Sequence, residues 1–145
     1  MQQEDGIKVT GRLVLTLRGP DGKVKTTRVA NTVTTAGKNG IADQLLAAPT
    51  LSKPTHMAVG TGSPAATLLG AEVDRNALTS KNRSGAVVTM VGDWAAGDAT
   101  AALTEAGIFD VVTPNTVNMY CSASFAVVNK LAADTLSISW TLTVA

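Results

Sequence analysis

Two stretches near the C-terminal end of the chain alternate apolar and polar residues with a period of two. In the stretch 135–144 the apolar side carries Leu136, Ile138, Trp140, Leu142 and Val144. In the stretch 117–127 one side carries Val117, Met119, Cys121, Ala123, Phe125 and Val127. Successive side chains of a β-strand point to opposite faces, so the pattern predicts two half-buried strands. We expect these two strands to pair as antiparallel neighbours.

The outward side of the last predicted strand consists only of hydroxyl residues. They are Thr135, Ser137, Ser139, Thr141 and Thr143. A face that is polar but uncharged suits either solvent or a flat, close contact with another protein. Neither interpretation involves chemistry at this face.

Similar alternation upstream predicts further strands. Lys8–Arg18 and Lys23–Asn31 alternate on either side of Gly19-Pro20-Asp21-Gly22, which places proline and glycine where a tight turn needs them. The other expected strands are 56–60, 75–81, 84–94 and 100–112. Seven or eight strands in 145 residues predict one all-β domain over 1–145, an antiparallel β-sandwich. Residues 1–7 have no such pattern, and we expect a flexible N-terminal arm.

The segment between Asn31 and Pro49 departs from alternation and predicts one short α-helix. Thr34 or Thr35 can cap its start, and Pro49 ends it. Ile41, Leu45 and Leu46 recur at helical spacing and are the residues expected to pack. Because Gly37 and Gly40 weaken an isolated helix, we expect packing at one end of the sandwich to hold it.

The composition limits how the core is built. Apolar residues make up 45% of the chain and aromatic residues only 3%. The core must therefore consist mainly of Val, Leu, Ile and Ala, with Trp94, Trp140, Phe109 and Phe125 as its few large side chains.

The net charge of +1 conceals an uneven distribution. Residues 1–83 carry 11 Lys/Arg and 6 Asp/Glu, whereas residues 84–145 carry 1 and 5. The basic strands are either solvated edges and outer faces or a surface for an acidic protein partner. Nucleic acid is not expected, because the overall basic excess and the reading elements of such binders are missing from the sequence.

Residues able to do chemistry are few. Cys121 is the single cysteine and His56 the single histidine, and both lie in apolar strand patterns that predict structural roles. Because its neighbours in the strand are apolar, Glu105 is a candidate general acid. We favour a structural Glu105 that hydrogen-bonds loop backbone or pairs with an arginine. Gly107, close after it, indicates a bulge or a close backbone approach.

The sequence predicts no cofactor, metal or small-molecule substrate. The loop Thr61–Thr67 contains glycines but lacks the lysine or the three spaced glycines of phosphate-binding loops, so a surface turn is expected. No apolar run approaches the roughly 18 residues of a membrane span. The start of the chain is not signal-like, and we expect a soluble protein made in a cytoplasm.

Four blocks of the sequence together resemble small structural proteins of tailed bacteriophages. They are HMAVGTGSPAATLLGAEVDR (56–75), LTEAGIFD (103–110), MYCSASFAVVNK (119–130) and DTLSISWTLTV (134–144). In length and single-domain build, the chain is most similar to the jelly-roll cement, or decoration, proteins on the capsids of short-tailed phages. The resemblance covers roughly the last 90 residues.

This resemblance implies a jelly-roll-like sandwich without enzymatic activity, made in the host bacterium and located on the capsid exterior. Its implied partner is the major capsid protein, and it implies a homo-oligomer, with a dimer favoured over a trimer. The candidate capsid contacts are Gln2, Gln3, Lys8, Arg12, Arg18, Lys23, Lys25 and Arg28. The alternatives are a phage tail, collar or fibre-base protein and, in another class, a carbohydrate-binding β-sandwich, which would need exposed aromatic residues.

Overall fold

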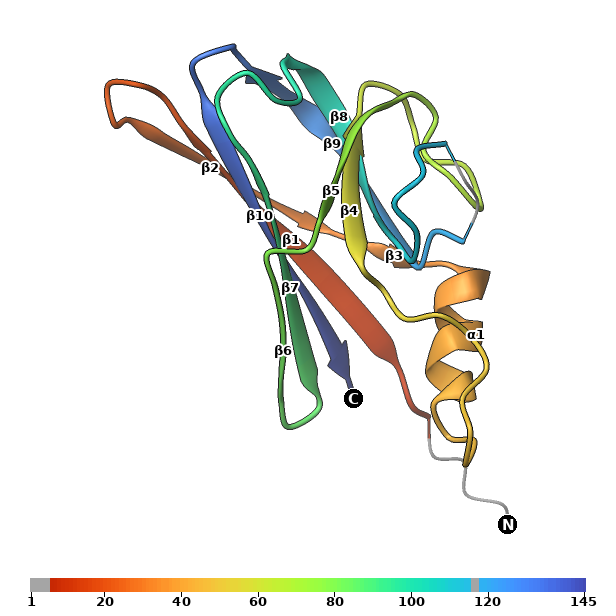
Figure 1. The fold of residues 1–145 in the computed structure, drawn as a ribbon. Coiled ribbons are helices and arrows are strands. Elements are labelled where there is room, and N and C mark those ends of the chain that lie inside the picture. The colour runs from red at the N-terminus through yellow and green to blue at the C-terminus, as the bar shows by residue number, and fades with distance from the viewer. Residues whose placement is uncertain (1–5, 116–117) are drawn as a thin grey trace.

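The computed structural model describes residues 6–115 and 118–145. Within them it contains ten strands in two antiparallel sheets and one short helix (Figure 1). The elements are β1 (Val9–Arg18), β2 (Val24–Ala30), β3 (Thr32–Val33), α1 (Thr35–Asp43), β4 (His56–Gly60), β5 (Glu72–Ala77), β6 (Ser80–Ser84), β7 (Val87–Trp94), β8 (Ala101–Phe109), β9 (Cys121–Lys130) and β10 (Thr135–Val144). The all-β sandwich with one helix is confirmed, with more strands than the seven or eight expected.

Five strands form each layer. Sheet A has the order β2-β1-β10-β7-β6, and sheet B has the order β3-β9-β8-β4-β5. The first strand lies beside the last, because β1 pairs with β10 from Val9↔Val144 to Arg18↔Thr135. The predicted hairpin is confirmed, because β1 pairs with β2 across the turn at residues 19–22.

The predicted pairing of the last two strands is wrong. β9 and β10 lie in opposite sheets: β9 pairs with β3 and β8, and β10 pairs with β1 and β7. Alternation determines which side chains face the core, but it does not determine which strand lies alongside. Residues 131–134 therefore carry the chain from sheet B to sheet A.

The core lies between the sheets and has most of the predicted large side chains. Phe109 is fully buried but belongs to a separate cluster. Leu136, Ile138 and Trp140 of β10, together with Trp94, are at most 1% exposed in the main core. Phe125 is partly buried against the same core. The alternation of β9 fails at its middle, where Val127 is 51% exposed and Val128 is buried. The register between β8 and β9 shifts at this point, and Val117 lies outside the described residues.

Helix α1 begins as predicted, but it ends at Asp43, before the expected end at Pro49, and it packs through different residues. The Thr34 hydroxyl accepts a hydrogen bond from the Gly37 N–H at 3.1 Å, which makes Thr34 the N-cap. The expectation that Ile41, Leu45 and Leu46 pack is wrong, because they are 40, 90 and 55% exposed.

Close approach to Tyr120 explains this orientation of the helix. The buried residues of α1 are Gly37, Gly40 and Asp43. A Cβ added at Gly40 would lie 2.5 Å from the Tyr120 ring. Only a face without side chains can come so near, so glycines rather than aliphatic residues face the sandwich. The Tyr120 hydroxyl in turn donates to the Ser52 carbonyl oxygen beyond the helix.

The single strand predicted over 75–81 is two strands in different sheets. β5 pairs with β4 in sheet B, whereas β6 pairs with β7 in sheet A. Leu78 lies at the crossing and packs against the core. Among the described residues, no helix is long and apolar enough to cross a membrane.

Candidate functional site

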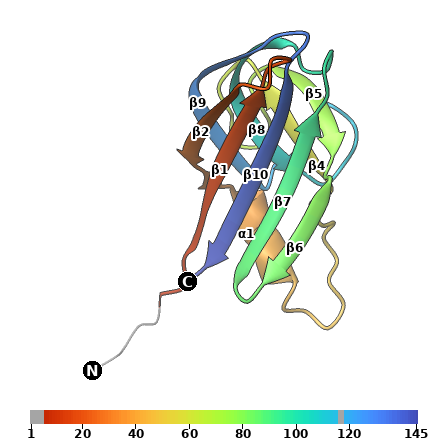
Figure 2. The same ribbon diagram turned by 90° about the vertical axis from the view of Figure 1, so that its left-hand side faces the viewer.

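The outer face of sheet A is a broad surface of small polar and β-branched side chains. Figure 2 looks onto this face and shows its five strands side by side. Its central side chains are Val14, Thr16, Thr89, Val91, Ser137, Ser139, Thr141 and Thr143, all of intermediate exposure. The hydroxyl row on β10 points outward as predicted, because Leu136, Ile138 and Trp140 between them are buried. We call this surface the Thr/Ser face.

Charge on the Thr/Ser face is sparse and mostly positive. Arg12 lies opposite Thr141 on one side and Ala30 on the other, and Arg28 lies opposite Val14. Directly opposed residues of an antiparallel pair share one face, so both arginines belong to the Thr/Ser face. Arg18 joins them opposite Thr135, and Asp93 lies opposite Ser137 near the other edge.

A hollow of about 390 Å³ lies at the arginine side of this face. Its lining includes Arg12, Arg28, Thr141 and Thr143. The two guanidinium groups and the two hydroxyl groups offer hydrogen-bond donors in one place. Carboxylate groups of a protein surface would match these donors.

The other predicted capsid contacts do not lie on this face. Lys25 is opposite Leu17, whose side chain packs toward the core, so Lys25 points to the inner side of edge strand β2. Lys23 belongs to the hairpin turn, and Lys8 pairs with Ala145 at the far end of β1. Gln2 and Gln3 lie outside the described residues. Of the candidate contacts in the described residues, the structure therefore places only Arg12, Arg18 and Arg28 on the Thr/Ser face, and only Arg12 and Arg28 line its hollow.

The middle of the outer face of sheet B, in contrast, is covered by loops. Ala58 and Phe109 of this sheet pack with Leu69 and Met119 from two crossing segments, and all four are at most 1% exposed. A Cβ added at Gly107 would lie 2.8 Å from the Met119 sulfur, so side chains, and not the predicted backbone, approach this glycine closely.

Glu105 fixes one of these loops, and its predicted structural role is confirmed. Its side chain is fully buried. The N–H groups of Gly62 and Ala71 donate to Oε1 at 3.0 and 2.7 Å, and the Gly70 N–H donates to Oε2 at 2.9 Å. Three backbone N–H groups thus bind this buried carboxylate. The glycine-containing loop therefore wraps around a carboxylate of its own chain.

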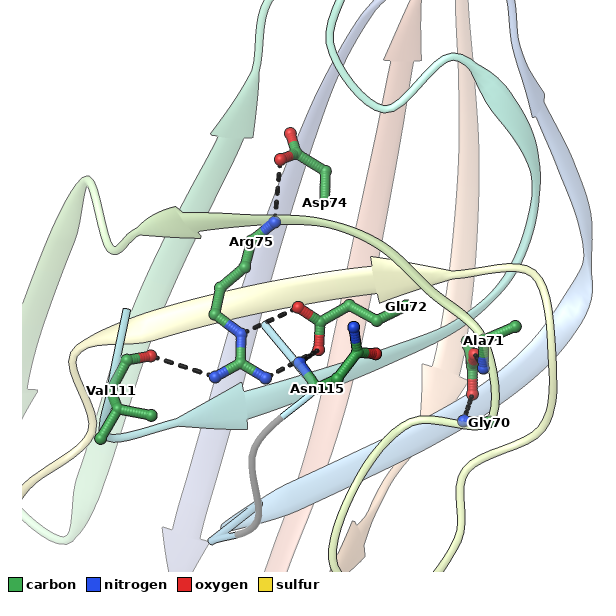
Figure 3. Close-up of polar contacts among 8 residues, drawn as sticks. Gly70, Ala71, Glu72, Asp74, Arg75, Val111 and Asn115 are labelled. Atoms are coloured by element: carbon green, nitrogen blue, oxygen red, sulfur yellow. Dashed lines mark hydrogen bonds and ion pairs between the residues drawn. The ribbon is translucent and has the colours of Figure 1, made fainter. Parts of the chain in front are cut away.

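Arg75 fixes the second covering segment, and the sequence did not reveal this role. Its guanidinium carbon lies 3.7 Å from the centre of the Phe109 ring. Figure 3 shows the guanidinium group between Glu72, at 2.7 Å, and the Val111 carbonyl oxygen, at 3.1 Å. Glu72 also accepts from the Asn115 N–H at 3.4 Å. An arginine within a polar run gives no signal of such a site, because Phe109 and Val111 are remote in sequence.

The single histidine and the single cysteine both lie in strands of sheet B. The His56 ring lies 2.7 Å from the Thr55 hydroxyl. Burial and, to a smaller extent, the charge of Arg75 lower the pKa of His56. Burial raises the pKa of Cys121 to about 12, which keeps it a thiol at neutral pH. Over the described ranges, no group of three His, Cys, Asp or Glu side chains could hold a metal ion.

The aromatic residues offer no platform for a sugar. All five lie in the described part of the chain: Trp94, Trp140, Phe109 and Tyr120 are buried, and Phe125 is partly buried. Carbohydrate-binding sandwiches stack sugars on exposed rings. The exposed pair of aromatic residues that would favour this class is therefore missing here.

Comparison with known proteins gives no relative: no family model, no curated protein and no solved structure matches the chain.

Proposed function

We propose that the protein is a non-enzymatic structural protein of a bacteriophage virion, which acts by binding another protein through its Thr/Ser face. The observation that supports this is the contrast between the two sheets. Loops cover the middle of the outer face of sheet B, whereas the outer face of sheet A presents mainly small polar and β-branched side chains on five paired strands, with few charges. Small side chains held by five paired strands lose little entropy on binding.

The finer proposal is a capsid cement protein on the outside of the shell, with the major capsid protein as its partner. The sequence blocks that carry the phage resemblance support a rigid module: Glu105 of one block binds the loop of another, and Arg75 stacks on Phe109. These residues build a scaffold and leave sheet A as the binding element.

In this proposal the hydroxyl rows provide close contact, and the three arginines select an acidic surface. Complementary charge contributes mainly to specificity and association rate. A homo-oligomer, with a dimer favoured, would place one such face on each of two neighbouring capsid subunits. Many copies with modest interfaces would then brace the shell, because each copy opposes local separation.

Co-sedimentation with empty shells of the phage's major capsid protein tests the proposal. We expect copies in a fixed ratio to the shell subunits, and shells that resist breakage at a higher temperature. No binding would contradict the cement role. Binding of only a few copies per particle would assign the protein to the tail, collar or fibre base instead.

A further inference from the structure

A second open surface lies at the end of the sandwich, between α1 and the β6–β7 hairpin. Figure 1 shows the hairpin extending past β4 and β5, with α1 beyond the end of sheet B. The space between them forms a groove of about 590 Å³. Its apolar lining comes from Val33, Ile41, Val88, Met90, Cys121 and Leu142. We call it the end groove.

The end groove is an incompletely closed part of the core. Val33, Val88 and Leu142 pack against the main core but are only partly buried, and Ile41 is 40% exposed. The glycine face of α1 turns toward Tyr120, so the helix supplies few side chains to fill the space. Apolar surface is thus left accessible between two fixed walls.

The polar groups of the end groove are all basic or neutral. Lys53, Lys81 and Arg83 line it, and no Asp or Glu does. Lys81 donates to the Pro54 carbonyl oxygen at 2.7 Å, and Arg83 donates to the Gly85 carbonyl oxygen at 2.8 Å. Neither forms an ion pair with a carboxylate of the described residues. An occupant with carboxylates would complement this rim.

The surroundings of the groove favour an elongated occupant. Leu45, Leu46 and Leu51 are 90, 55 and 45% exposed, and they adjoin the lining residues Gln44 and Ser52. β6 is an edge strand of sheet A, so one of its sides has no strand partner within the described fold. Lys81 and Arg83 of this strand line the groove. An extended segment along this edge would pass between the apolar lining and the basic side chains Lys53, Lys81 and Arg83.

We propose that the end groove binds an extended segment of a partner protein in which aliphatic side chains alternate with carboxylates. The aliphatic side chains fill the apolar lining, and the carboxylates meet Lys53, Lys81 and Arg83. The binding is independent of the Thr/Ser face and does not rest on the capsid proposal.

The test uses methyl and amide NMR of the full chain with short peptides as probes. One peptide alternates leucine and glutamate, and its counterpart has glutamine in place of glutamate. We expect the acidic peptide to shift the signals of Val33, Ile41, Val88 and Leu142 in a saturable way, and the neutral peptide to bind more weakly. Decanoate, an aliphatic carboxylate, is titrated separately.

Two sets of variants locate the site. Lys81→Glu with Arg83→Glu should weaken binding of the acidic peptide roughly tenfold through reversal of two rim charges. The matched control, Lys23→Glu with Lys25→Glu at the opposite edge of sheet A, should bind as the parent does. Ile41→Ser, at an exposed helix position, should weaken both peptides without loss of fold.

Three outcomes would overturn the proposal. Shifts confined to other surfaces would place the peptide elsewhere. If both charge-reversed variants lost peptide binding equally, the effect would come from the overall charge of the protein and not from the groove. Decanoate shifting the groove methyl signals while neither peptide does would make the groove a small-molecule site.

Discussion

Glu105 shows how one carboxylate can hold a whole covering segment. Its three backbone hydrogen bonds come from Gly62, Gly70 and Ala71, at the two ends of the loop that follows β4. Gly60 is required beside it, because a Cβ there would lie 2.4 Å from Oε1. The loop and the carboxylate therefore form one unit, and neither would keep its geometry without the other.

Replacing Glu105 should destabilise the protein strongly. In Glu105→Gln the amide group faces backbone donors with only one acceptor oxygen, so we expect a loss of about 1.5–3 kcal/mol in the free energy of unfolding. Urea unfolding of the variant and the parent measures this loss. Asp98→Asn, at an exposed turn, removes the same charge and should change little. Equal stability of the Glu105 variant and the parent would contradict the structural role.

Cys121 should be unreactive in the folded protein. It is 1% exposed, and burial raises its pKa to about 12, so neither access nor thiolate is available at neutral pH. Iodoacetamide should leave the native chain unmodified and alkylate one site after unfolding in urea, as measured by intact mass. Rapid modification of the native protein would indicate that the sandwich opens at β9.

Alkaline pH should weaken the fold through the same thiol. The folded pKa lies above the usual value of 9.0, so the stability linked to the neutral thiol is fully present below about pH 9. It should decline as pH rises from there toward 12. Urea unfolding over this range in the parent and in Cys121→Ala measures the slope. The variant should lose less stability with rising pH; equal slopes would exclude a contribution from Cys121.

At the scale of elements, α1 packs against the sandwich through glycines, which have no side chains. A Cβ added at Gly37 would lie 2.2 Å from the Tyr120 carbonyl oxygen. This contact lies at the point where the helix meets the start of β9. At Gly37, helix propensity therefore favours alanine, whereas packing requires glycine.

Gly37→Ala separates these two effects. Alanine raises helix propensity by roughly 1 kcal/mol, but the clash with fixed backbone should outweigh it and cost about 1–3 kcal/mol overall. Asn39→Ala, at an exposed position of the same helix, gains propensity without a clash and should be neutral or slightly stabilising. Thermal unfolding of both variants gives the comparison. A stabilised Gly37 variant would show that the helix does not pack this closely.

The sequence predicts elements well and their neighbours poorly, for physical reasons. Alternation in 135–144 predicts the buried and outward residues of β10, including the hydroxyl row, because burial of one face imposes a period of two. Pairing depends on how the chain crosses between sheets, so the β9–β10 prediction fails. Ile41, Leu45 and Leu46, which the spacing predicts to be packed, are exposed. The reason is that the side of the helix in contact with Tyr120 must carry glycine.

The same holds for the candidate site: its residue types can be predicted from the sequence, but their arrangement cannot. The Thr/Ser composition of the face is visible in the sequence, but the grouping of Arg12 with Arg28 needs the order β2-β1-β10. Lys25, three residues from Arg28, looks equivalent in the sequence and lies on the other side of the strand. The end groove has no sequence signal, because it arises where a hairpin extends beyond the opposite sheet.

For the whole molecule, we expect charge changes to weaken binding to capsid shells only where they lie on the Thr/Ser face. Arg12→Glu with Arg28→Glu should weaken binding to capsid shells and reduce its dependence on salt, because both residues lie on the proposed contact surface. Lys25→Glu, on the same edge strand but the opposite side, should leave shell binding near that of the parent. Co-sedimentation at several salt concentrations measures both. Equal effects of the two changes would remove the Thr/Ser face from the interface.

The pairing of β1 with β10 also determines where anything attached to this module would start. The Lys8 N–H donates to the Ala145 carbonyl oxygen at 2.6 Å, and the Ala145 N–H donates to the Lys8 carbonyl oxygen at 2.8 Å. Polypeptide fused before Lys8 or after Ala145 would therefore leave from one corner of the sandwich. A short linker could join these two positions. The chain could then be opened at the β6–β7 turn, beside Gly85, and this circularly permuted protein would keep every strand pair intact.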